Sequence, residues 1–168
     1  VPVGGRFTAA GRAVYEAVEA ARRAAVAAVR PGATLSEVHD AATRVLVEFL
    51  VAERLLEGEA DERIAAGDHK AFAPHSISHW LGLDVHDPGD YARAGAARTL
   101  EPGMVFTVEP GLYFGPAALA AGGVRAERFA GIGVRIEDDL VVTAEGHENL
   151  TAALPTDPDE LAARMPRA

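Results

Sequence analysis

The spacing of apolar residues changes once along this chain, near residue 73, and that change limits the possible folds more than any other feature. Before it, apolar residues recur every three or four positions, as on one face of an α-helix. After it, short runs of β-branched and aromatic residues are separated by Gly and Pro, as in an antiparallel sheet. Helices that precede strands in this way indicate an α+β fold.

Two helices are predicted in the first third of the chain. The first ends at Pro31-Gly32, and its apolar face consists of Tyr15, Val18, Ala21, Ala25 and Val29. The second begins with the capping box Thr34-Leu35-Ser36-Glu37 and continues to about Leu56. The charged segment 57–70 that follows is predicted to be a surface connection, which could include one frayed helical turn.

Two strands are predicted in the second half. Residues 104–109 follow a Pro-Gly turn and alternate, with Thr107 and Glu109 on the face opposite the larger apolar side chains. Residues 133–142 form the other strand, in which Val134 and Ile136 face away from the charged residues. Asp138 and Asp139 are expected in a turn. From residue 155 onward we expect a loop and a short terminal helix.

Composition narrows the classes of function. The formal net charge of −9, with scattered Lys and Arg, disfavours nucleic acid as a partner. No run approaches the roughly 20 apolar residues that cross a bilayer, so no membrane partner is expected. The chain has no cysteine, so nitrogen and oxygen atoms would have to hold any metal ion. No secretory signal is recognisable, and the cytoplasm is the expected location.

Three of the six histidines fall within residues 75–87. His75 and His79 would share a face on a helix, but Pro74 and Gly82 disfavour a helix here, and a strand followed by a loop fits better. A lone histidine is more often a satisfied or solvated polar side chain than a ligand. The clustering of three favours a functional role.

Two places in the second half of the chain put carboxylates where packing alone does not require them. Glu109 ends an apolar strand, and burying its charge would be costly unless a cation or a donor meets it. The other Glu-Pro-Gly, at Glu101, is explained as a residue that precedes a turn. Arg135, Glu137 and Asp139 share one face of the later strand, although a solvated edge strand would explain that pattern equally well. One imidazole with several carboxylates suits Mn²⁺, Co²⁺ or Fe²⁺ better than structural zinc.

Three motifs together resemble the catalytic domain of aminopeptidase P, a pita-bread metallopeptidase. They are His-Ser-Ile-Ser-His-Trp-Leu-Gly-Leu-Asp-Val-His-Asp at 75–87, Thr-Val-Glu-Pro-Gly-Leu-Tyr at 107–113 and Gly-Ile-Gly-Val-Arg-Ile-Glu-Asp-Asp at 131–139. The resemblance covers residues 4–154. It implies an N-terminally truncated α+β pita-bread fold of the creatinase and aminopeptidase type, with helices packed on one face of an antiparallel sheet. Residues 1–154 would form a partial catalytic domain and residues 155–168 a C-terminal tail.

The resemblance also implies a metal site. His79 would be the imidazole ligand, Glu109 a carboxylate ligand, and Glu137 the carboxylate that bridges two divalent ions, most simply Mn²⁺. Such a pair of ions activates a water molecule for attack on a peptide carbonyl. The implied substrate is a peptide whose second residue is proline.

Three further residues acquire roles from the same resemblance. His86 would steady the developing oxyanion near the scissile bond, and His75 would line the proline pocket. Arg135 would orient the site electrostatically. Ser76 stands where the family usually has Gly, which leaves the local backbone near His75 in question.

The chain departs from the family in what it does not contain. The two aspartate ligands, a further active-site histidine and the N-terminal domain would precede residue 1. We therefore expect that this chain alone holds one ion weakly or none and is inactive or nearly so. Three readings stay open: an Xaa-Pro dipeptidase, a non-catalytic module that binds a peptide or a protein, and a truncated sequence with no separate function. A homo-oligomer is also conceivable, because a shortened sheet would expose an edge.

Overall fold

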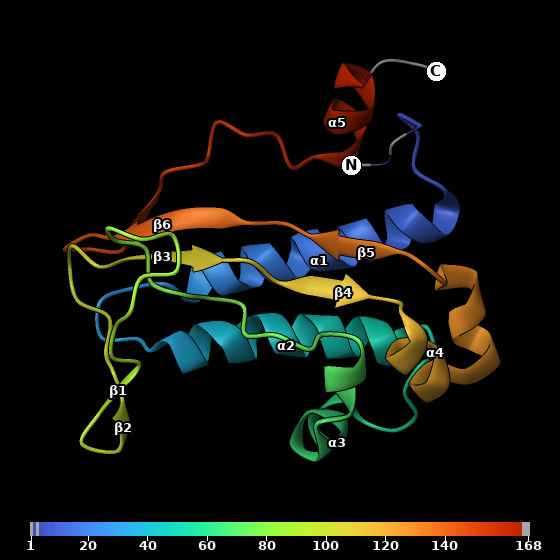
Figure 1. Ribbon diagram of the computed structural model, residues 1–168, viewed down its shortest axis with the longest axis horizontal. Helices are drawn as coiled ribbons and strands as arrows, with labels where there is room; N and C mark the ends of the chain where they lie inside the picture. The colour runs from blue at the N-terminus through green and yellow to red at the C-terminus, as the bar shows by residue number, and fades with distance from the viewer. Residues whose placement is uncertain (1, 3, 166–168) are drawn as a thin grey trace.

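Two long helices form one layer of the computed structural model and the strands form the other (Figure 1). The structure describes residue 2 and residues 4–165. Helix α1 spans Ala9–Ala28 and helix α2 spans Leu35–Ala52. The prediction that helices pack on one face of the sheet is confirmed.

Side-chain caps fix the starts of both helices, and the start of α2 is the predicted one. Thr8 caps α1 by accepting a hydrogen bond from the backbone of Gly11, and Thr34 and Glu37 form the predicted capping box of α2. Helix α2 ends at Ala52, one turn before the predicted end. The two helices pack against each other, and Ala21, Ala25 and Ala42 on them are fully buried.

The segment 57–70 contains more regular structure than a surface connection. Helix α3 spans Ala60–Ala66, and the 3₁₀ helix η1 spans Asp68–Ala71. Gly67 lies between them with φ of 75°, the left-handed conformation that commonly ends a helix at glycine. Helix α3 buries no residue, whereas His69 of η1 is buried. The prediction of a surface connection is therefore correct for α3 but not for η1.

The sheet is built around two strand pairs that lie in line with each other (Figure 1). Strand β3 (Val105–Val108) pairs with β6 (Asp138–Val142), and β4 (Gly111–Tyr113) pairs with β5 (Gly133–Arg135), both antiparallel. Strand β7 (His147–Asn149) extends the first pair on the β6 side. A small separate hairpin consists of β1 (Ala92–Arg93) and β2 (Ala96–Ala97). The single strand predicted for 133–142 is therefore two strands, separated at Ile136 and Glu137.

The break does not change the register. Val108 lies opposite Asp138, and Gly111 lies opposite Arg135. Both pairs belong to the same antiparallel register, and in that register Glu109 lies opposite Glu137. Pro110 has no N–H to donate, which explains why the ladder is interrupted at this point. The two carboxylates therefore face each other across the interruption.

Residues 77–81 run along the other edge of β3, as the prediction of a strand and loop rather than a helix requires. The backbone N–H of Thr107 donates to the His79 carbonyl at 2.9 Å, and that of Glu109 donates to the Ile77 carbonyl at 2.7 Å. Trp80 forms a β-bridge with Phe106. This pairing places His79 beside β3.

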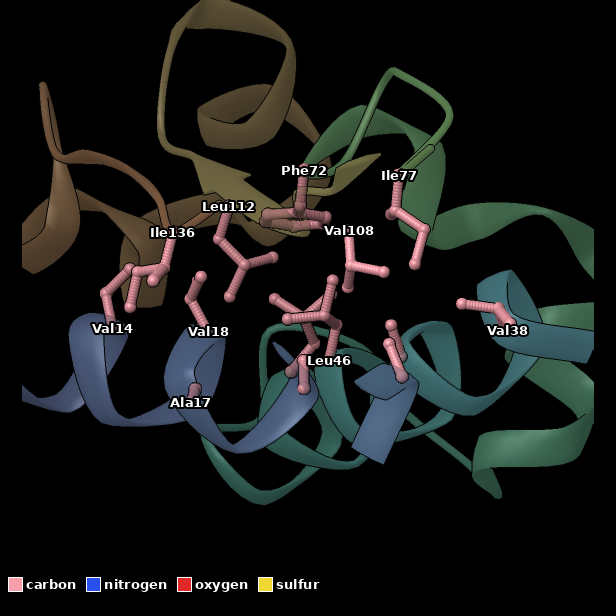
Figure 2. Packing of buried hydrophobic residues seen from close by; sticks show 14 of the residues in the cluster. Val14, Ala17, Val18, Val38, Leu46, Phe72, Ile77, Val108, Leu112 and Ile136 are labelled. Atoms are coloured by element: carbon pink, nitrogen blue, oxygen red, sulfur yellow. The ribbon is translucent and has the colours of Figure 1, made fainter. Parts of the chain in front are cut away.

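The core lies between the two layers (Figure 2). Val14 and Val18 of α1 and Leu46 of α2 point toward Val108 and Leu112 of the sheet, and all five are at most 2% exposed. The remaining helical segments lie at the periphery: α4 (Pro116–Gly122) and η2 (Gly123–Phe129) connect β4 to β5, and α5 (Pro158–Arg164) follows the sheet. The predicted short terminal helix is confirmed by α5.

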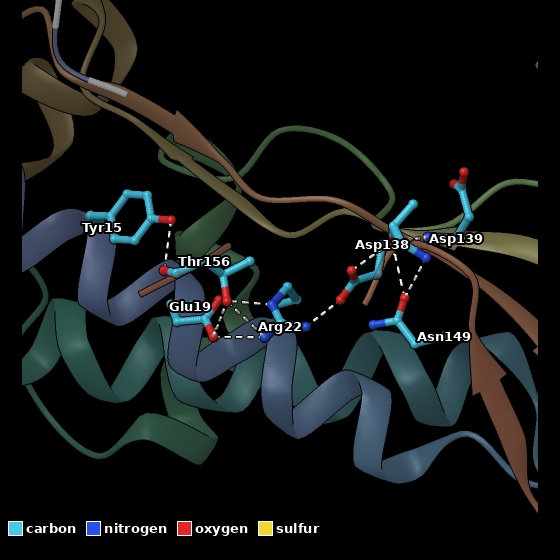
Figure 3. Close-up of polar contacts among 8 residues, drawn as sticks. Tyr15, Glu19, Arg22, Asp138, Asp139, Asn149 and Thr156 are labelled. Atoms are coloured by element: carbon cyan, nitrogen blue, oxygen red, sulfur yellow. Dashed lines mark hydrogen bonds and ion pairs between the residues drawn. The ribbon is translucent and has the colours of Figure 1, made fainter. Parts of the chain in front are cut away.

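Asp138 and Asp139 open strand β6, so their prediction as turn residues was wrong. Asp138 is 3% exposed and forms an ion pair with Arg22 of α1, a residue far away in the sequence. Arg22 also contacts Glu19 at 2.6 Å. Figure 3 shows this buried charge cluster and its continuation through Thr156, whose hydroxyl donates to Glu19 at 3.1 Å. The cluster joins α1, β6 and the segment that leads to α5.

Tyr15 extends the same contact, because its hydroxyl donates to the Thr156 carbonyl at 2.9 Å. Burial, followed by the negative charge of Glu19, raises the pKa of Tyr15 from 10.0 to about 12. A pKa that is higher in the folded state gives stability that is complete below pH 10 and is lost as pH rises through 12. We expect an absorbance titration of phenolate to show one late-titrating group that disappears in Tyr15→Phe. A titration unchanged by that substitution would contradict the burial of this hydroxyl.

Candidate metal centre

Three of the predicted site residues converge at the interruption in the sheet. His79, Glu109 and Glu137 each offer one ligand atom, and these atoms all lie within 4.8 Å of one another. Nε2 of His79 is 3.2 Å from Oε1 of Glu109. The three residues come from the edge segment 77–81, from the gap between β3 and β4, and from the gap between β5 and β6. Residues far apart in sequence thus meet at one position.

The opposed carboxylates of Glu109 and Glu137 are unfavourable by themselves, because like charges on directly opposite residues of an antiparallel pair repel. Glu109 is 6% exposed, and Glu137 is exposed as a residue although its carboxyl group is partly desolvated. Burial raises the pKa of Glu137, and the negative charges of Glu109 and then Asp139 raise it further. A cation between the two carboxylates would remove this penalty.

The donor set fits a divalent metal ion. One imidazole and two carboxylates form an oxygen-rich set of the kind that holds Mn²⁺, Fe²⁺ or Co²⁺. Within the described residues, no side chain or backbone group donates a hydrogen bond to the Glu137 carboxylate, and no cation pairs with it. Its oxygens are therefore free to act as ligands.

Hydrogen bonds hold the other two residues in place. The Thr107 hydroxyl donates to Oε1 of Glu109 at 3.1 Å and accepts from the backbone N–H of His79 at 3.1 Å. Arg135 contacts the second oxygen, Oε2 of Glu109, at 3.1 Å. Nδ1 of His79 lies 3.1 Å from the Trp80 carbonyl, which can only accept, so Nδ1 is held by the backbone and Nε2 is the ring nitrogen that faces the carboxylates.

The structure brings the remaining predicted residues to the same cavity, which His75, His79, His86, Glu109 and Arg135 all line. The His86 ring lies 4.3 Å from the His79 ring, measured between centroids. His75 also lines this cavity. This arrangement is what the sequence predicts for the positions of His75, His86 and Arg135. It does not test the chemical roles predicted for them.

Tyr113 is a residue that the sequence reasoning missed. Its hydroxyl accepts a hydrogen bond from Nε of Arg135 at 2.7 Å and lies 2.8 Å from Nε2 of His75. Nδ1 of His75 donates to the Ser76 carbonyl at 2.8 Å, so Nε2 accepts the Tyr113 proton. Alternation along the strand places residues 109, 111 and 113 on one face, and that period could have identified Tyr113.

The cluster of one imidazole and two carboxylates is a set that could hold a metal ion, and this agrees with the family to which the chain is similar. The model of metallopeptidase family M24 matches residues 1–144, and the chain belongs to this family. It is 46% identical to the Xaa-Pro aminopeptidase of Escherichia coli (strain K12), over 98% of this chain and 36% of that protein. It is 40% identical to the Xaa-Pro dipeptidase of Homo sapiens, over 98% of this chain and 38% of that protein.

Solved structures agree with the predicted fold. Proline aminopeptidase P II from Yersinia pestis matches with a TM-score of 0.88 and 49% identity, over 96% of this chain and 36% of that one. The aminopeptidase PepP of Pseudomonas aeruginosa matches with a TM-score of 0.87 and 46% identity, over 95% of this chain and 35% of that one. The prediction of a pita-bread fold of the aminopeptidase P type is confirmed. The chain spans about a third of the length of these relatives.

Among the described helices, none combines the length and apolar character that crossing a membrane requires.

Proposed function

We propose that this chain is the part of an Xaa-Pro peptidase that supplies His79, Glu109 and Glu137 to a divalent metal centre. The whole protein would release the N-terminal residue from peptides whose second residue is proline. The observation that supports this most strongly is the convergence of one imidazole and two opposed carboxylates. In this proposal residues 1–154 are part of the catalytic domain, and residues 155–168 are a C-terminal tail, whose helix α5 contacts α1.

Mn²⁺ is the metal that we propose, with two ions in a complete site. A divalent metal at such a site supplies Lewis-acid chemistry: it polarises a peptide carbonyl and lowers the pKa of water. Three ligands can hold one ion, but without the two further aspartates of the family we expect weak binding or none by this chain alone. We expect the isolated chain to be inactive or nearly so.

The chain's other residues would position and stabilise the substrate. The His86 imidazole, beside His79, can donate a hydrogen bond to the oxygen that becomes negative during attack on a carbonyl. Tyr113 keeps His75 in one tautomer, so its ring presents a fixed surface for the proline side of the substrate. Arg135 holds Glu109 through Oε2 and offsets part of the negative charge of the two carboxylates.

Two other functions remain candidates. The 40% identity to the Xaa-Pro dipeptidase of Homo sapiens favours a dipeptidase as the first of them. The second is a pita-bread module that binds a peptide or a protein without cleaving it.

The test is an assay of the protein that contains this chain with Mn²⁺, on Ala-Pro-Ala and on Ala-Pro, with Glu137→Gln as the inactive reference. Release of Ala from the tripeptide supports the proposal. Cleavage of the dipeptide alone would identify a dipeptidase, and binding without cleavage would identify a module.

Thr107→Val is expected to lower the affinity for Mn²⁺ by about 10- to 100-fold, the usual effect of losing a group that orients a ligand. The substitution keeps the side-chain volume but removes the donor to Glu109 and the acceptor for the His79 N–H. Mn²⁺ titration followed by water proton relaxation measures the change. Thr99→Val, at an exposed position away from the centre, is the control. Equal affinities of the two variants would show that Thr107 does not orient the ligands.

A further inference from the structure

A second cavity of about 440 Å³ lies beside the metal centre. Ser36 and His39 from the start of α2, His69 and Lys70 from η1, and the segment 73–78 line it. His75 and Ser78 belong to the walls of both this cavity and the metal-centre cavity, so the two cavities adjoin each other. The volume falls within the range of about 300–1,000 Å³ that is usual for ligand sites.

Several polar atoms of this second cavity have no partner. His69 is 8% exposed and Ser78 is 6% exposed, yet Nδ1 of His69 and Oγ of Ser78 form no hydrogen bond with any residue that the structure describes. Nδ1 of His39 is also buried without a partner. Buried polar groups in folded proteins are nearly always hydrogen-bonded, so an unpaired set that lines one cavity points to a ligand.

The described residues that line the second cavity do not form a second cluster of three metal ligands. Within the described part of the chain, His79, Glu109 and Glu137 are the one group of three or more His, Asp or Glu whose ligand atoms are close enough together. Burial lowers the pKa of His39 and of His69, so both imidazoles are neutral at pH 7 and can exchange hydrogen bonds with uncharged groups. Peptide N–H and C=O groups suit such partners.

The two adjoining cavities differ in the charge of their walls. Among the described residues, no Asp or Glu lines the second cavity, although the chain carries a formal net charge of −9. Asp40 and Asp68 neighbour His39 and His69 in sequence but do not line it, and Asp68 accepts a hydrogen bond from Arg63 at 2.9 Å. Lys70, the chain's only lysine, stands at the wall. The metal centre, in contrast, presents two carboxylates, which attract a free amino group.

We infer that the second cavity binds the C-terminal part of the peptide substrate, beyond the proline, with the free carboxylate near Lys70 and the peptide groups on His39, His69 and Ser78. The amino end then lies toward Glu109 and Glu137. The inference rests on the proposed function and adds to it a preference for short peptides with a free C-terminus. Amidation of that terminus should weaken binding about 2- to 5-fold, the size of an exposed ion pair.

The experiment is an NMR titration of the metal-free chain with Ala-Pro-Ala-Ala and with its C-terminal amide. Imidazole signals of His39 and His69 report on the second cavity, and those of His79 and His86 report on the metal centre. Because the chain has a single lysine, ¹³C-methylation adds one side-chain probe at Lys70 that keeps its positive charge. We expect all of these signals to shift with the free acid, and the Lys70 signal to shift less with the amide.

Lys70→Gln should remove the difference in affinity between acid and amide, while Arg30→Gln, a charge loss at an exposed position, should keep it. Peptide shifts confined to His79 and His86 would overturn the inference and leave the proposed function intact. A chain in which no signal shifts at millimolar peptide would also overturn the inference, whereas the proposed function is tested by the assay on the protein that contains this chain.

Discussion

Glu109→Ala is expected to lower the affinity of this chain for Mn²⁺ by at least about 100-fold, because loss of a group that merely orients a ligand already costs about 10- to 100-fold. Glu109 is the central residue of the site. It contacts His79 and Arg135 and lies opposite Glu137 in the sheet. Its removal leaves an imidazole and one exposed carboxylate, which is a poor set of ligands for a hard cation. Electron paramagnetic resonance of free Mn²⁺ measures the affinity even when binding is weak.

The chain supplies a matched control for this substitution. Glu101 also precedes Pro-Gly but is exposed and lies away from the cavity of the metal centre. Glu101→Ala should bind Mn²⁺ as the unsubstituted chain does. Equal losses in the two variants would indicate that general acidity attracts the ion, and that no site exists at Glu109.

Arg22→Ala is expected to destabilise the fold by about 3–5 kcal/mol, the cost of removing one partner from a buried ion pair. The Arg22 side chain is 11% exposed and lies between Glu19 and Asp138, which are 9% and 4% exposed. The Thr151 hydroxyl still donates to Asp138 at 2.7 Å in the variant, but no cation then meets either carboxylate. Urea denaturation measures the free energy of unfolding.

Arg23→Ala is the control on the same helix, since Arg23 is exposed and a surface substitution changes stability by about 0.5 kcal/mol or less. The predicted result is a large loss for Arg22 and almost none for Arg23. Losses of similar size would mean that the charge cluster in Figure 3 does not hold α1 against β6.

The first helices could be predicted because their signals are local. The apolar face of α1 and the capping box of Thr34 and Glu37 lie within a few residues of the structure that they specify. Asp138 was mispredicted for the opposite reason. Two adjacent aspartates are typical of a turn, and nothing nearby in the sequence shows that Arg22, which comes from another element, neutralises one of them.

The candidate site was predicted from motifs rather than from geometry. Residue types and a family resemblance selected His79, Glu109 and Glu137, but no local pattern states that β3 and β6 keep their register across the interruption at Pro110. That register is a long-range property of the sheet. Tyr113 and the cavity lined by His39 and His69 escaped notice because their partners come from elements that the sequence does not place side by side.

The most direct test is anomalous diffraction at the manganese absorption edge from a crystal of this chain soaked in Mn²⁺. At a Mn²⁺ concentration high enough to fill a weak site, we predict one peak within ligand distance of Nε2 of His79 and the carboxylates of Glu109 and Glu137. A map in which manganese lies elsewhere, or in which these three side chains point away from one another, would contradict the account.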